Sequence, residues 1–535
     1  MKRRLIAIIA LFCFLRVIIA QTSTQLFSIN DSTVGTSSVT GLPLATIRYM
    51  AGGKISGWHW DGFSDNLLLE LKESNDKEAS FKNSGILEMV DLKTKEVKWN
   101  RPMNYTSSEV RQQGNYYFLS EKKKNFCLHP QTGNVLWENR NEFYFVDPFL
   151  NIGIGYPLQS MSNKLTAIDL TTGKELWKKR INRSSGWNDA YMLNDSILLI
   201  SVDGIKAINL ATGNGWSHKA NTTRKEIGKM VGINLFGIIM GMFTGLYVYQ
   251  AQPDVSSDMV SNMLIDPYEN TILASKDQIS RIDSSGKTVW STSLPKKKTS
   301  KSSLFLIDST VYMINRGYAQ YNGNFSMIGD PYLASFDLES GKQLYFTSIP
   351  EKKEFIRNFQ VVNNKIFVVF EEKIVSYSLN DGVRTAEKVL ELEEGEYLDS
   401  FVESGIYCKG NDPFFKELAS EFYNYNLMMT SKDRIFVLTD NLETVLIYGK
   451  NDLYYKKASN PQYTLISKND SDFIVLDNSD KSVATLKASP DMFLHHDKLY
   501  FLNKDSFSEV DLDQLHQSPS LWQSIFKDIT KFMPK

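Results

Sequence analysis

One short phrase recurs along the chain and constrains its fold more than any other feature. At 165–181 the sequence reads LTAIDLTTGKELWKKRI, an alternating segment, a polar turn and a second segment that holds Trp177. Alternation of apolar and polar residues over about four to eight positions is typical of a half-buried β-strand. Asp and Gly favour the tight turn between two such segments. The phrase therefore predicts a β-hairpin.

Copies of this phrase follow one another at a nearly constant interval. The threonines of the first four turns, Thr94, Thr132, Thr172 and Thr212, are separated by 38, 40 and 40 residues. Weaker copies continue to about residue 511, and a period of this length indicates a repeat architecture. The residues that we expect to be structural in the repeat are Asp91, Asp169, Asp283, Asp337, Gly173, Gly341, Trp99, Trp137, Trp177 and Trp290.

Each copy predicts one small antiparallel sheet. Asp169 can accept hydrogen bonds from the turn amides, and Gly173 can supply a backbone conformation with positive φ. Apolar segments such as ILLIS at 197–201 fit a strand that is covered on both faces. A single small sheet cannot bury its faces, whereas stacked neighbours can. We therefore expect Trp177 to fill the seam between two sheets.

Two copies depart from the phrase in an informative way. Lys95 stands in place of the turn glycine, and His129 stands in place of the turn aspartate. Cys127 occupies the position of Ala167, which predicts a small buried residue. A disulfide between Cys127 and Cys408 remains an alternative in an exported chain.

The repeat resembles the quinoprotein-type β-propeller repeat, whose consensus is Ala-x-Asp-x-x-Thr-Gly-x-x-x-Trp. The residues that match it in full are Ala167, Asp169, Thr172, Gly173 and Trp177. The resemblance covers most of residues 45–515 and weakens after Gly341. It implies an all-β fold with a single β-propeller over 21–515. Such propellers usually have seven or eight blades, whereas about ten turns are visible here, so we expect eight blades and keep seven to ten open.

The same resemblance bears on activity. The family contains quinone-dependent dehydrogenases and non-enzymatic scaffolds, among them a lipoprotein subunit of the outer-membrane β-barrel assembly machinery. Its quinone enzymes carry two adjacent cysteines and a calcium set of Glu, Asn and Asp, but this sequence has no Cys-Cys pair and no stretch that matches the calcium set. We therefore expect a non-enzymatic scaffold with no quinone or other cofactor, no catalytic residue and no metal site. The alternative is a quinone- or metal-dependent oxidoreductase.

The N-terminus is typical of a secretory signal. Three basic residues precede an apolar run over 5–15, and Ala20-Gln21 fits a cleavage point. An uncleaved anchor is the alternative. Removal of 1–20 takes away four positive charges and changes the formal net charge from −1 to −5, which lacks the basic field of a nucleic-acid binder. We expect an exported protein, periplasmic or associated with the cell envelope, that binds no nucleic acid.

One interval is too long for the repeat. Gly213 and Gly286 are 73 residues apart, which predicts an insert at about 218–253. Its apolar run at 230–249 would be about 30 Å long as a helix and would just span the hydrocarbon layer of a membrane. On that helix Gly237, Gly241 and Gly245 share one face, which allows a close approach.

These glycines, with Phe236 and Phe243, form our candidate contact surface for an envelope protein or a membrane. Packing of the insert on the propeller itself is equally compatible with the sequence. A membrane-associated sensor ectodomain is a further alternative for the whole chain.

Two more segments predict helices that either cover the propeller or bind a partner. At 411–425, Asp412 fits an N-cap and Pro413 the first helical position. At 516–535 an apolar stripe predicts an amphipathic C-terminal helix.

Two clusters of ring-bearing residues remain. Trp58, His59 and Trp60 are predicted to pack in the core rather than to form a contact surface. His495, His496 and Asp497 precede an apolar strand, and His496 and Asp497 are predicted to form the turn before it. Two neighbouring histidines without a third spaced ligand are a weak signal for zinc.

Overall fold

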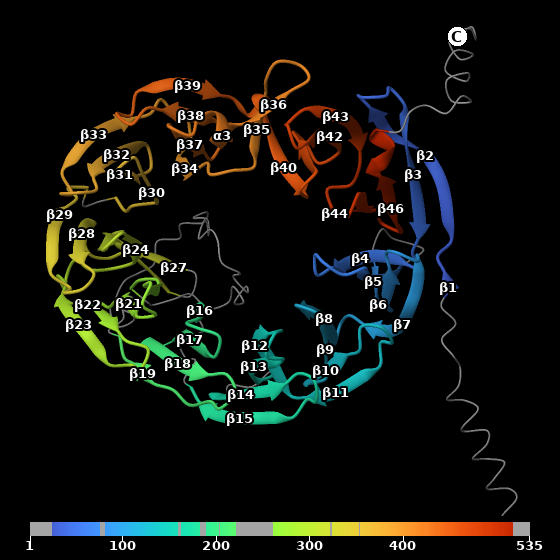
Figure 1. Cartoon of the computed structure of the whole chain (residues 1–535), viewed down its shortest axis with the longest axis horizontal. Coiled ribbons are helices and arrows are strands. Elements are labelled where there is room, and N and C mark those ends of the chain that lie inside the picture. Colours follow the sequence, from blue (N-terminus) through green and yellow to red (C-terminus); the bar gives the residue numbers. More distant parts are fainter. Residues whose placement is uncertain are drawn as a thin grey trace, which may run out of the picture. The chain divides into compact units, whose positions relative to one another are not determined.

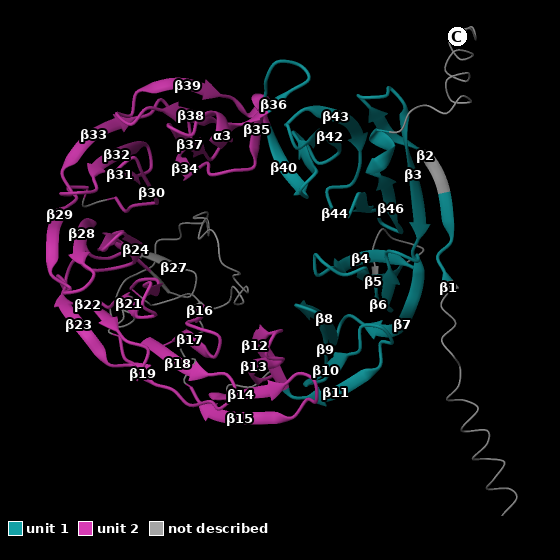
Figure 2. Cartoon of the chain, in the orientation of Figure 1, with its two compact units in different colours: residues 1–140, 409–415, 454–535 teal, residues 141–408, 416–453 magenta. Residues whose placement is uncertain are grey.

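The computed structural model describes residues 24–74, 81–158, 162–181, 189–202, 204–220, 260–321, 324–351 and 354–516. Almost every element in these ranges is a β-strand (Figure 1), which confirms the expectation of an all-β fold. The helical elements of these described ranges are α3 (Leu418–Glu421) and the short 3-10 turns η1 (Lys450–Asp452) and η2 (Leu512–Leu515). The chain divides into unit 1 (Met1–Arg140, Lys409–Phe415 and Tyr454–Lys535) and unit 2 (Asn141–Cys408 and Lys416–Leu453), which Figure 2 distinguishes by colour.

Unit 2 contains six antiparallel sheets of four strands. The first sheet consists of β12 (Asn141–Asp147), β13 (Ile152–Pro157), β14 (Lys164–Asp169) and β15 (Glu175–Arg180). The second consists of β16 (Asp189–Met192), β17 (Ile197–Val202), β18 (Gly204–Asn209) and β19 (Ser217–His218). The third consists of β20 (Leu264–Ile265), β21 (Thr271–Ala274), β22 (Gln278–Ile282) and β23 (Thr288–Ser293). The fourth sheet consists of β24 (Ser302–Ile307), β25 (Thr310–Asn315), β28 (Tyr332–Asp337) and β29 (Gln343–Ser348). The fifth consists of β30 (Asn358–Val362), β31 (Lys365–Val369), β32 (Lys373–Ser378) and β33 (Arg384–Val389). The sixth consists of β34 (Leu398–Phe401), β37 (Asn426–Thr430), β38 (Ile435–Leu438) and β39 (Thr444–Tyr448). A separate hairpin is formed by β26 (Tyr318–Tyr321) and β27 (Asn324–Met327).

Unit 1 begins with two similar sheets. The first is β4 (Lys54–His59), β5 (Asn66–Ser74), β6 (Phe81–Asp91) and β7 (Glu96–Asn104), with β1 (Thr24–Gln25) added at the β7 edge; the second is β8 (Ser108–Gln113), β9 (Tyr116–Glu121), β10 (Lys124–Leu128) and β11 (Val135–Asn139). A longer sheet runs in the order β40-β41-β42-β43-β2-β3-β46-β45-β44. Its strands are β40 (Leu453–Ser459), β41 (Tyr463–Ser467), β42 (Asp472–Asp477), β43 (Ser482–Lys487), β2 (Ser28–Ser37), β3 (Pro43–Met50), β44 (Met492–His495), β45 (Lys498–Leu502) and β46 (Ser506–Asp511). The short strands β35 (Ile406–Lys409) and β36 (Phe415–Glu417) lie where the chain passes between the units.

The longer sheet contains two four-stranded groups, β40 to β43 and β3 with β44 to β46. The fourth strand of the second group, β3, comes from the N-terminal part of the chain and pairs with β46. The described residues therefore form ten four-stranded groups, the upper end of the seven to ten blades that the sequence left open, of which eight was the expected number. Each visible turn of the repeat ends the third strand of one group, so none of the turns belongs to an extra hairpin. Successive four-stranded antiparallel sheets are consistent with a β-propeller.

The phrase at 165–181 forms β14, a turn and β15. One carboxylate oxygen of Asp169 accepts hydrogen bonds from the amides of Thr171 (2.8 Å) and Thr172 (3.0 Å). Gly173 has a φ of 72°, a conformation that costs other residues free energy because of the Cβ atom. In the copy that lacks the aspartate, His129 accepts a hydrogen bond through Nδ1 from the Gln131 amide at 3.1 Å. An imidazole nitrogen thus replaces the carboxylate oxygen.

The tryptophan of one sheet lies on the turn glycine of the next. The Trp99 indole donates a hydrogen bond to the Pro130 carbonyl at 2.9 Å. A Cβ atom at Gly133 would lie 2.5 Å from the Trp99 ring, so this glycine is needed for close approach as well as for its positive φ. The other pairs are Trp177 on Gly213, Trp216 on Gly286, Trp290 on Gly341 and, with a tyrosine, Tyr345 on Gly382.

Apolar side chains fill the rest of each seam. In unit 2, for example, Leu165 of β14 packs in one cluster with Leu198 and Ile200 of β17. Comparable clusters join every consecutive pair of its six sheets. In unit 1 they join β4–β7 to β8–β11 and to the group that contains β44–β46. Burial of this surface is the main source of stability for the stack.

One seam uses charge in place of tryptophan. Lys95 adopts the positive φ of the missing glycine (63°) and is buried. Its ammonium pairs with Glu509, donates to the Tyr500 hydroxyl at 2.9 Å and lies 5.4 Å from the centre of the Tyr49 ring. Burial raises the pKa of Glu509, but hydrogen bonds from Lys498 and Lys95 outweigh it and hold this pKa below its usual value.

The segment 411–425 differs from the predicted helix. The Pro413 carbonyl accepts a hydrogen bond from the Ser482 amide, and the Phe415 amide donates to the Asp480 carbonyl, both at 2.9 Å. These bonds hold the segment extended beside the turn at 480–482. The helix α3 consequently begins at Leu418, so the prediction of a helix from Pro413 is wrong because strand pairing overrides the local N-terminal signal.

Several predictions fall outside the described residues. They are the signal at 1–20, the contact surface Phe236, Gly237, Gly241, Phe243 and Gly245, and the C-terminal helix at 516–535 beyond its first residue, His516. Within the described ranges, no helix combines the length and the apolar character needed to cross a membrane. Cys127 and Cys408 are both free and buried.

A buried acid gives the fold a pH dependence. Glu88 of β6 is buried, and one of its carboxylate oxygens has no hydrogen-bond partner. Burial raises the pKa of Glu88 from its usual 4.5 to about 7, and a hydrogen bond from the Gly52 amide opposes the rise only in part. The protonated form is therefore the one that the fold favours.

We expect the Glu88 contribution to stability to be present below about pH 4.5 and to be lost as the pH rises to about 7. Glu88→Gln removes the charge at every pH. It should raise the free energy of unfolding at pH 8 by about 2–3 kcal/mol and leave it almost unchanged at pH 4.5. Urea unfolding of both proteins at the two pH values measures this, and an equal effect at both would show that the charge of Glu88 does not matter.

Candidate functional site

The two turns of each sheet meet at the same end, which we call the turn end. In an antiparallel sheet of consecutive strands, the turn between strands one and two and the turn between strands three and four lie side by side. The Leu170 amide, just after the turn acid Asp169, donates to the Asn151 carbonyl of the other turn at 2.8 Å. The same bond recurs from Leu92, Leu210, Leu338, Leu379 and Leu512. These buried leucines belong to the repeat, and the sequence analysis missed them.

Exposed aromatic rings stand on several of these turns. Between β12 and β13, Asp147 accepts hydrogen bonds from the amides of Phe149 and Leu150, both at 2.9 Å. The Phe149 side chain is 93% exposed. The buried carboxylate fixes the backbone of the turn, so the ring projects from a rigid base. A ring held in this way loses little conformational entropy when it binds.

A second turn repeats the arrangement between β20 and β21. Asp266 accepts from the Tyr268 amide at 2.8 Å and pairs with the Arg281 guanidinium at 2.7 Å. Arg281 is buried and also lies 5.7 Å from the centre of the Tyr268 ring. Tyr268 nevertheless remains 67% exposed. In unit 2, Phe149 and Tyr268 therefore both project at the turn end.

Unit 1 has the same device between β4 and β5. Asp61 accepts from the amides of Phe63 (2.9 Å) and Ser64 (2.7 Å), and Phe63 is 80% exposed. The Trp60 indole donates to the Ser64 carbonyl at 2.9 Å and closes the turn from inside.

These three turns share a sequence signal that lies outside the repeat phrase. An aspartate is followed by Gly or Pro and then by an aromatic residue, at 61–63, 147–149 and 266–268. The signal alone is ambiguous, because Asp330-Pro331-Tyr332 has the same order and Tyr332 is buried at the start of β28. What distinguishes the exposed rings is that each lies within a turn.

The structure places Trp58, His59 and Trp60 between core and surface. Trp58 and Trp60 stack on Phe493, with ring centres 5.4 Å and 4.4 Å away, and His59 pairs with Glu70 at 2.8 Å. The same three residues, with Asp61, Gln112 and Gly114, line a cavity of about 400 Å³. The cluster therefore packs against the core through its tryptophans, as predicted, and also lines a cavity that opens at the surface.

His495 and His496 have a third partner that sequence reasoning could not supply. Asp65, which precedes β5, lies 2.7 Å from Nε2 of His495. His496 begins the turn between β44 and β45 with a φ of 52°, and its ring centre is 4.1 Å from that of His495. One ligand atom from each of the three residues lies within 4.8 Å of the others. The long separation in sequence hid this cluster.

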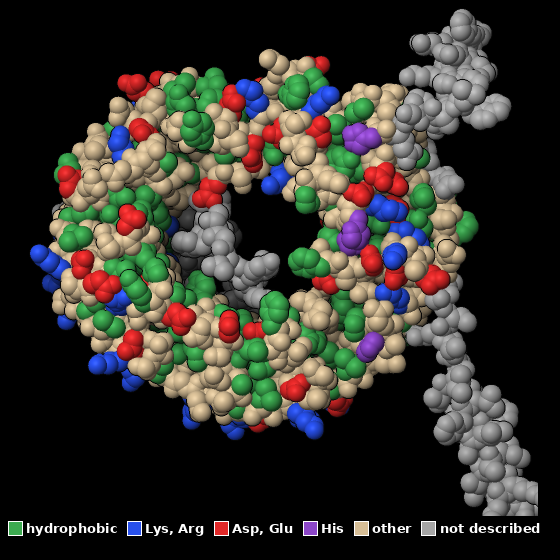
Figure 3. Space-filling view, viewed as in Figure 1, with side chains coloured by type: hydrophobic (Ala, Val, Ile, Leu, Met, Phe, Trp, Pro, Cys, Tyr) green, Lys and Arg blue, Asp and Glu red, His purple; other side chains and the backbone are tan. Residues whose placement is uncertain are grey.

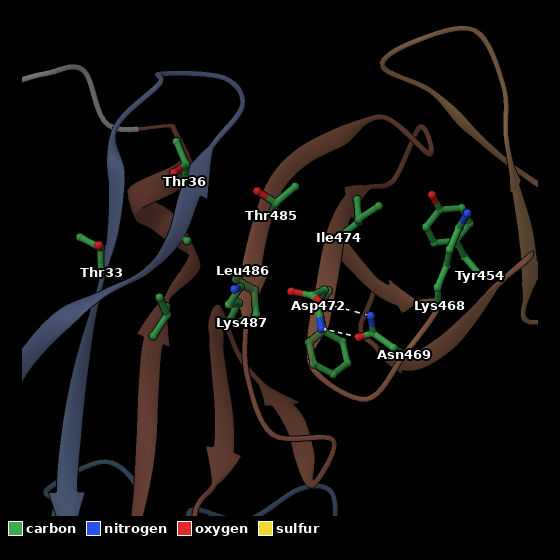
Figure 4. Close-up of a pocket in the computed structure, with 13 residues that line it drawn as sticks. Thr33, Thr36, Tyr454, Lys468, Asn469, Asp472, Ile474, Thr485, Leu486 and Lys487 are labelled. Carbon is green, nitrogen blue, oxygen red and sulfur yellow. Dashed lines mark hydrogen bonds between the residues drawn. The ribbon is translucent and has the colours of Figure 1, made fainter. Parts of the chain in front are cut away.

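The cavity drawn in Figure 4 lies between β2 and the strands β41 to β43. It has a volume of about 510 Å³. Lys468 and Lys487 contribute positive charge, and Asp472 contributes a negative charge that is held by hydrogen bonds with Asn469 (Figure 4). Two positive charges face one negative charge across this lining, and we assign this cavity no ligand.

Comparisons with known proteins identify no family. No protein-family model matches the sequence, and no curated protein matches it. Among solved structures, the chain is similar to BamB from Moraxella catarrhalis, with 11% identity over 71% of this chain and 96% of that chain and a TM-score of 0.32. It is also similar to the C-terminal WD40 domain of Sif2 (10% identity, 76% and 98% coverage, TM-score 0.32) and to the computationally designed Ika8 protein (10% identity, 75% and 97% coverage, TM-score 0.30). At such TM-scores these likenesses carry no argument, and the fold rests on the chain's own sheets.

Proposed function

We propose that this chain is a non-enzymatic β-propeller scaffold that binds protein partners at the turn ends of its sheets. The observation that carries the proposal is the set of exposed aromatic rings on aspartate-braced turns, with Phe149 the most exposed. Aromatic residues are enriched among the side chains that contribute most to protein–protein binding. Figure 3 shows hydrophobic side chains at the surface among acidic and basic ones.

The proposed setting is the cell envelope. It is supported by the predicted secretory signal at 1–20 and by the resemblance of the repeat to a family with envelope scaffolds. The insert at 218–253, with Phe236, Gly237, Gly241, Phe243 and Gly245, remains a proposed second contact with an envelope protein or a membrane. We propose no quinone cofactor, because the adjacent cysteines of the quinone enzymes are missing from the sequence.

The test compares partner capture by four forms of the full chain in the organism that produces it. Phe149→Ser and Tyr268→Ser each remove one exposed ring, and Val389→Ser is the matched control. Val389 is 59% exposed in unit 2 and lies at the end of β33 farthest from its turn. After mild crosslinking, we expect the two ring variants to retain about a tenth or less of a specific partner, since such residues contribute about 2 kcal/mol or more.

The melting temperatures should remain close to that of the wild type, because all three changes are at the surface. Unchanged capture by both ring variants would contradict the proposal. Equal loss with Val389→Ser would also contradict it, since binding would then not depend on the turn end.

A further inference from the structure

We propose that Asp65, His495 and His496 form a binding site for a divalent transition-metal ion of the Zn²⁺ type at the turn end of unit 1. Nothing in the repeat or in the proposed scaffold function requires these three side chains together. Imidazole nitrogen and carboxylate oxygen are ligands that Zn²⁺, Co²⁺ and Ni²⁺ accept. The proposal rests on where the fold places the three residues.

The cluster joins two sheets that pack face to face. Asp65 ends the turn between β4 and β5, and its carbonyl accepts the Leu92 amide at 2.7 Å. His495 is the last residue of β44, and the sheets meet through a shared core that includes Phe493 and Leu67. Because both backbones are fixed by strand pairing and by this core, the ligand atoms are positioned before any ion binds.

The burial of the three residues is graded from core to solvent. His495 is buried, Asp65 is partly buried and His496 is exposed. The edge of Trp60 packs against the His495 ring, with 5.4 Å between ring centres, which limits rotation of that imidazole. The His496 backbone is held by a hydrogen bond from the Asn460 side chain to its carbonyl at 2.9 Å. An ion can therefore enter from the His496 side and meet a fixed ligand pair behind it.

The arrangement is better suited to an ion than to a simple ion pair. A single Asp–His pair would account for Asp65 and His495, but it would not account for the second imidazole beside the first. His496 lies in the turn that follows β44, with a φ of 52°, and this turn places its ring 4.1 Å from that of His495. Three protein ligands leave further positions for water or for a group from a partner.

The test uses the full chain after treatment with a chelator, with Zn²⁺ alone as the titrant in calorimetry. Asp65→Asn and His496→Asn remove one ligand each, and the asparagine at 496 tolerates the positive φ. His129→Asn is the matched control, because His129 is also a turn histidine and an asparagine can take over its hydrogen bond from Gln131. We expect one saturable site in the wild type and in His129→Asn. Binding should be weakened by more than about tenfold in the other two variants.

Two further readouts keep the result independent of folding defects. Zn²⁺ should raise the melting temperature of the wild type and of His129→Asn, and Co²⁺ should give visible absorption bands only in these two proteins. If His496→Asn lowers the melting temperature without metal, Asp65→Asn decides the question. No saturable binding by the wild type, or equal binding by all four proteins, would overturn the proposal.

Discussion

Trp99→Ala is expected to lower the free energy of unfolding by about 3–5 kcal/mol, the usual cost of truncating a buried tryptophan. Trp99 is only 2% exposed. Its ring covers Gly133, and its indole donates to the Pro130 carbonyl of the neighbouring sheet. Truncation removes packing from the seam and leaves that carbonyl without its partner. Urea unfolding followed by far-ultraviolet circular dichroism measures the loss.

A double-mutant cycle separates the seam from a general defect. Gly133→Ala alone should destabilise the protein by about 1–3 kcal/mol, because the added Cβ overlaps the indole. In the Trp99→Ala background the overlap disappears, so only the backbone strain of the positive φ remains. Gly62→Ala isolates that strain, since Gly62 has a φ of 84° and no atom within 4 Å of the added Cβ. Strictly additive effects of Trp99→Ala and Gly133→Ala would contradict the packing of this ring on this glycine.

Glu509→Ala is expected to cost a similar amount, about 3–5 kcal/mol, because it leaves a buried ammonium without its counter-ion. Lys95 and Glu509 are both buried. Burial lowers the pKa of Lys95, and the Glu509 carboxylate opposes this shift. Removing the carboxylate therefore favours loss of the Lys95 proton. The loss of stability should be smaller at pH 10 than at pH 7.

An exposed ion pair provides the control. Lys124 and Glu138 lie 2.6 Å apart, with both side chains about half exposed. Glu138→Ala should cost no more than about 1 kcal/mol. Equal losses of unfolding free energy for Glu509→Ala and Glu138→Ala would show that burial adds nothing to the contribution of the Lys95–Glu509 pair.

The repeat explains how much of the fold could be predicted. The period near 40, the turn acids and the turn glycines identify the hairpins, because these turns depend on local chemistry alone. About ten turns are visible in the sequence and each belongs to one four-stranded group; the expectation of eight came from the usual blade number of the family that the repeat resembles. The pairing of β3 with β46, by contrast, could not be predicted. Such long-range pairing leaves no local signal. Two seams use residues that the repeat phrase does not contain: Lys95 pairs with Glu509 in one, and Tyr345 lies on Gly382 in the other.

The segment at 411–425 shows the opposite error. Asp412 and Pro413 are good helix-start residues, but the backbone near Pro413 pairs with the turn at 480–482 instead. Local preference is worth a fraction of a kcal/mol per residue, so a few tertiary hydrogen bonds and a buried Phe415 are enough to override it.

The candidate sites also differ in whether a local sequence signal predicts them. The aspartate-braced aromatic turns could have been found, because the aspartate and the ring lie two residues apart. The cluster of Asp65 with His495 and His496 could not, because its members are 430 residues apart in sequence. The fold alone brings the turn ends of their two sheets together.

The most direct test of the scaffold function is site-specific photocrosslinking in the producing organism. A photoreactive phenylalanine analogue would replace Phe149, Tyr268 or Val389, one at a time, in the full chain. The proposed function predicts a discrete crosslinked protein from positions 149 and 268 and none from position 389. Crosslinks from position 389 alone, or no crosslink from 149 and 268, would contradict a binding surface at the turn end.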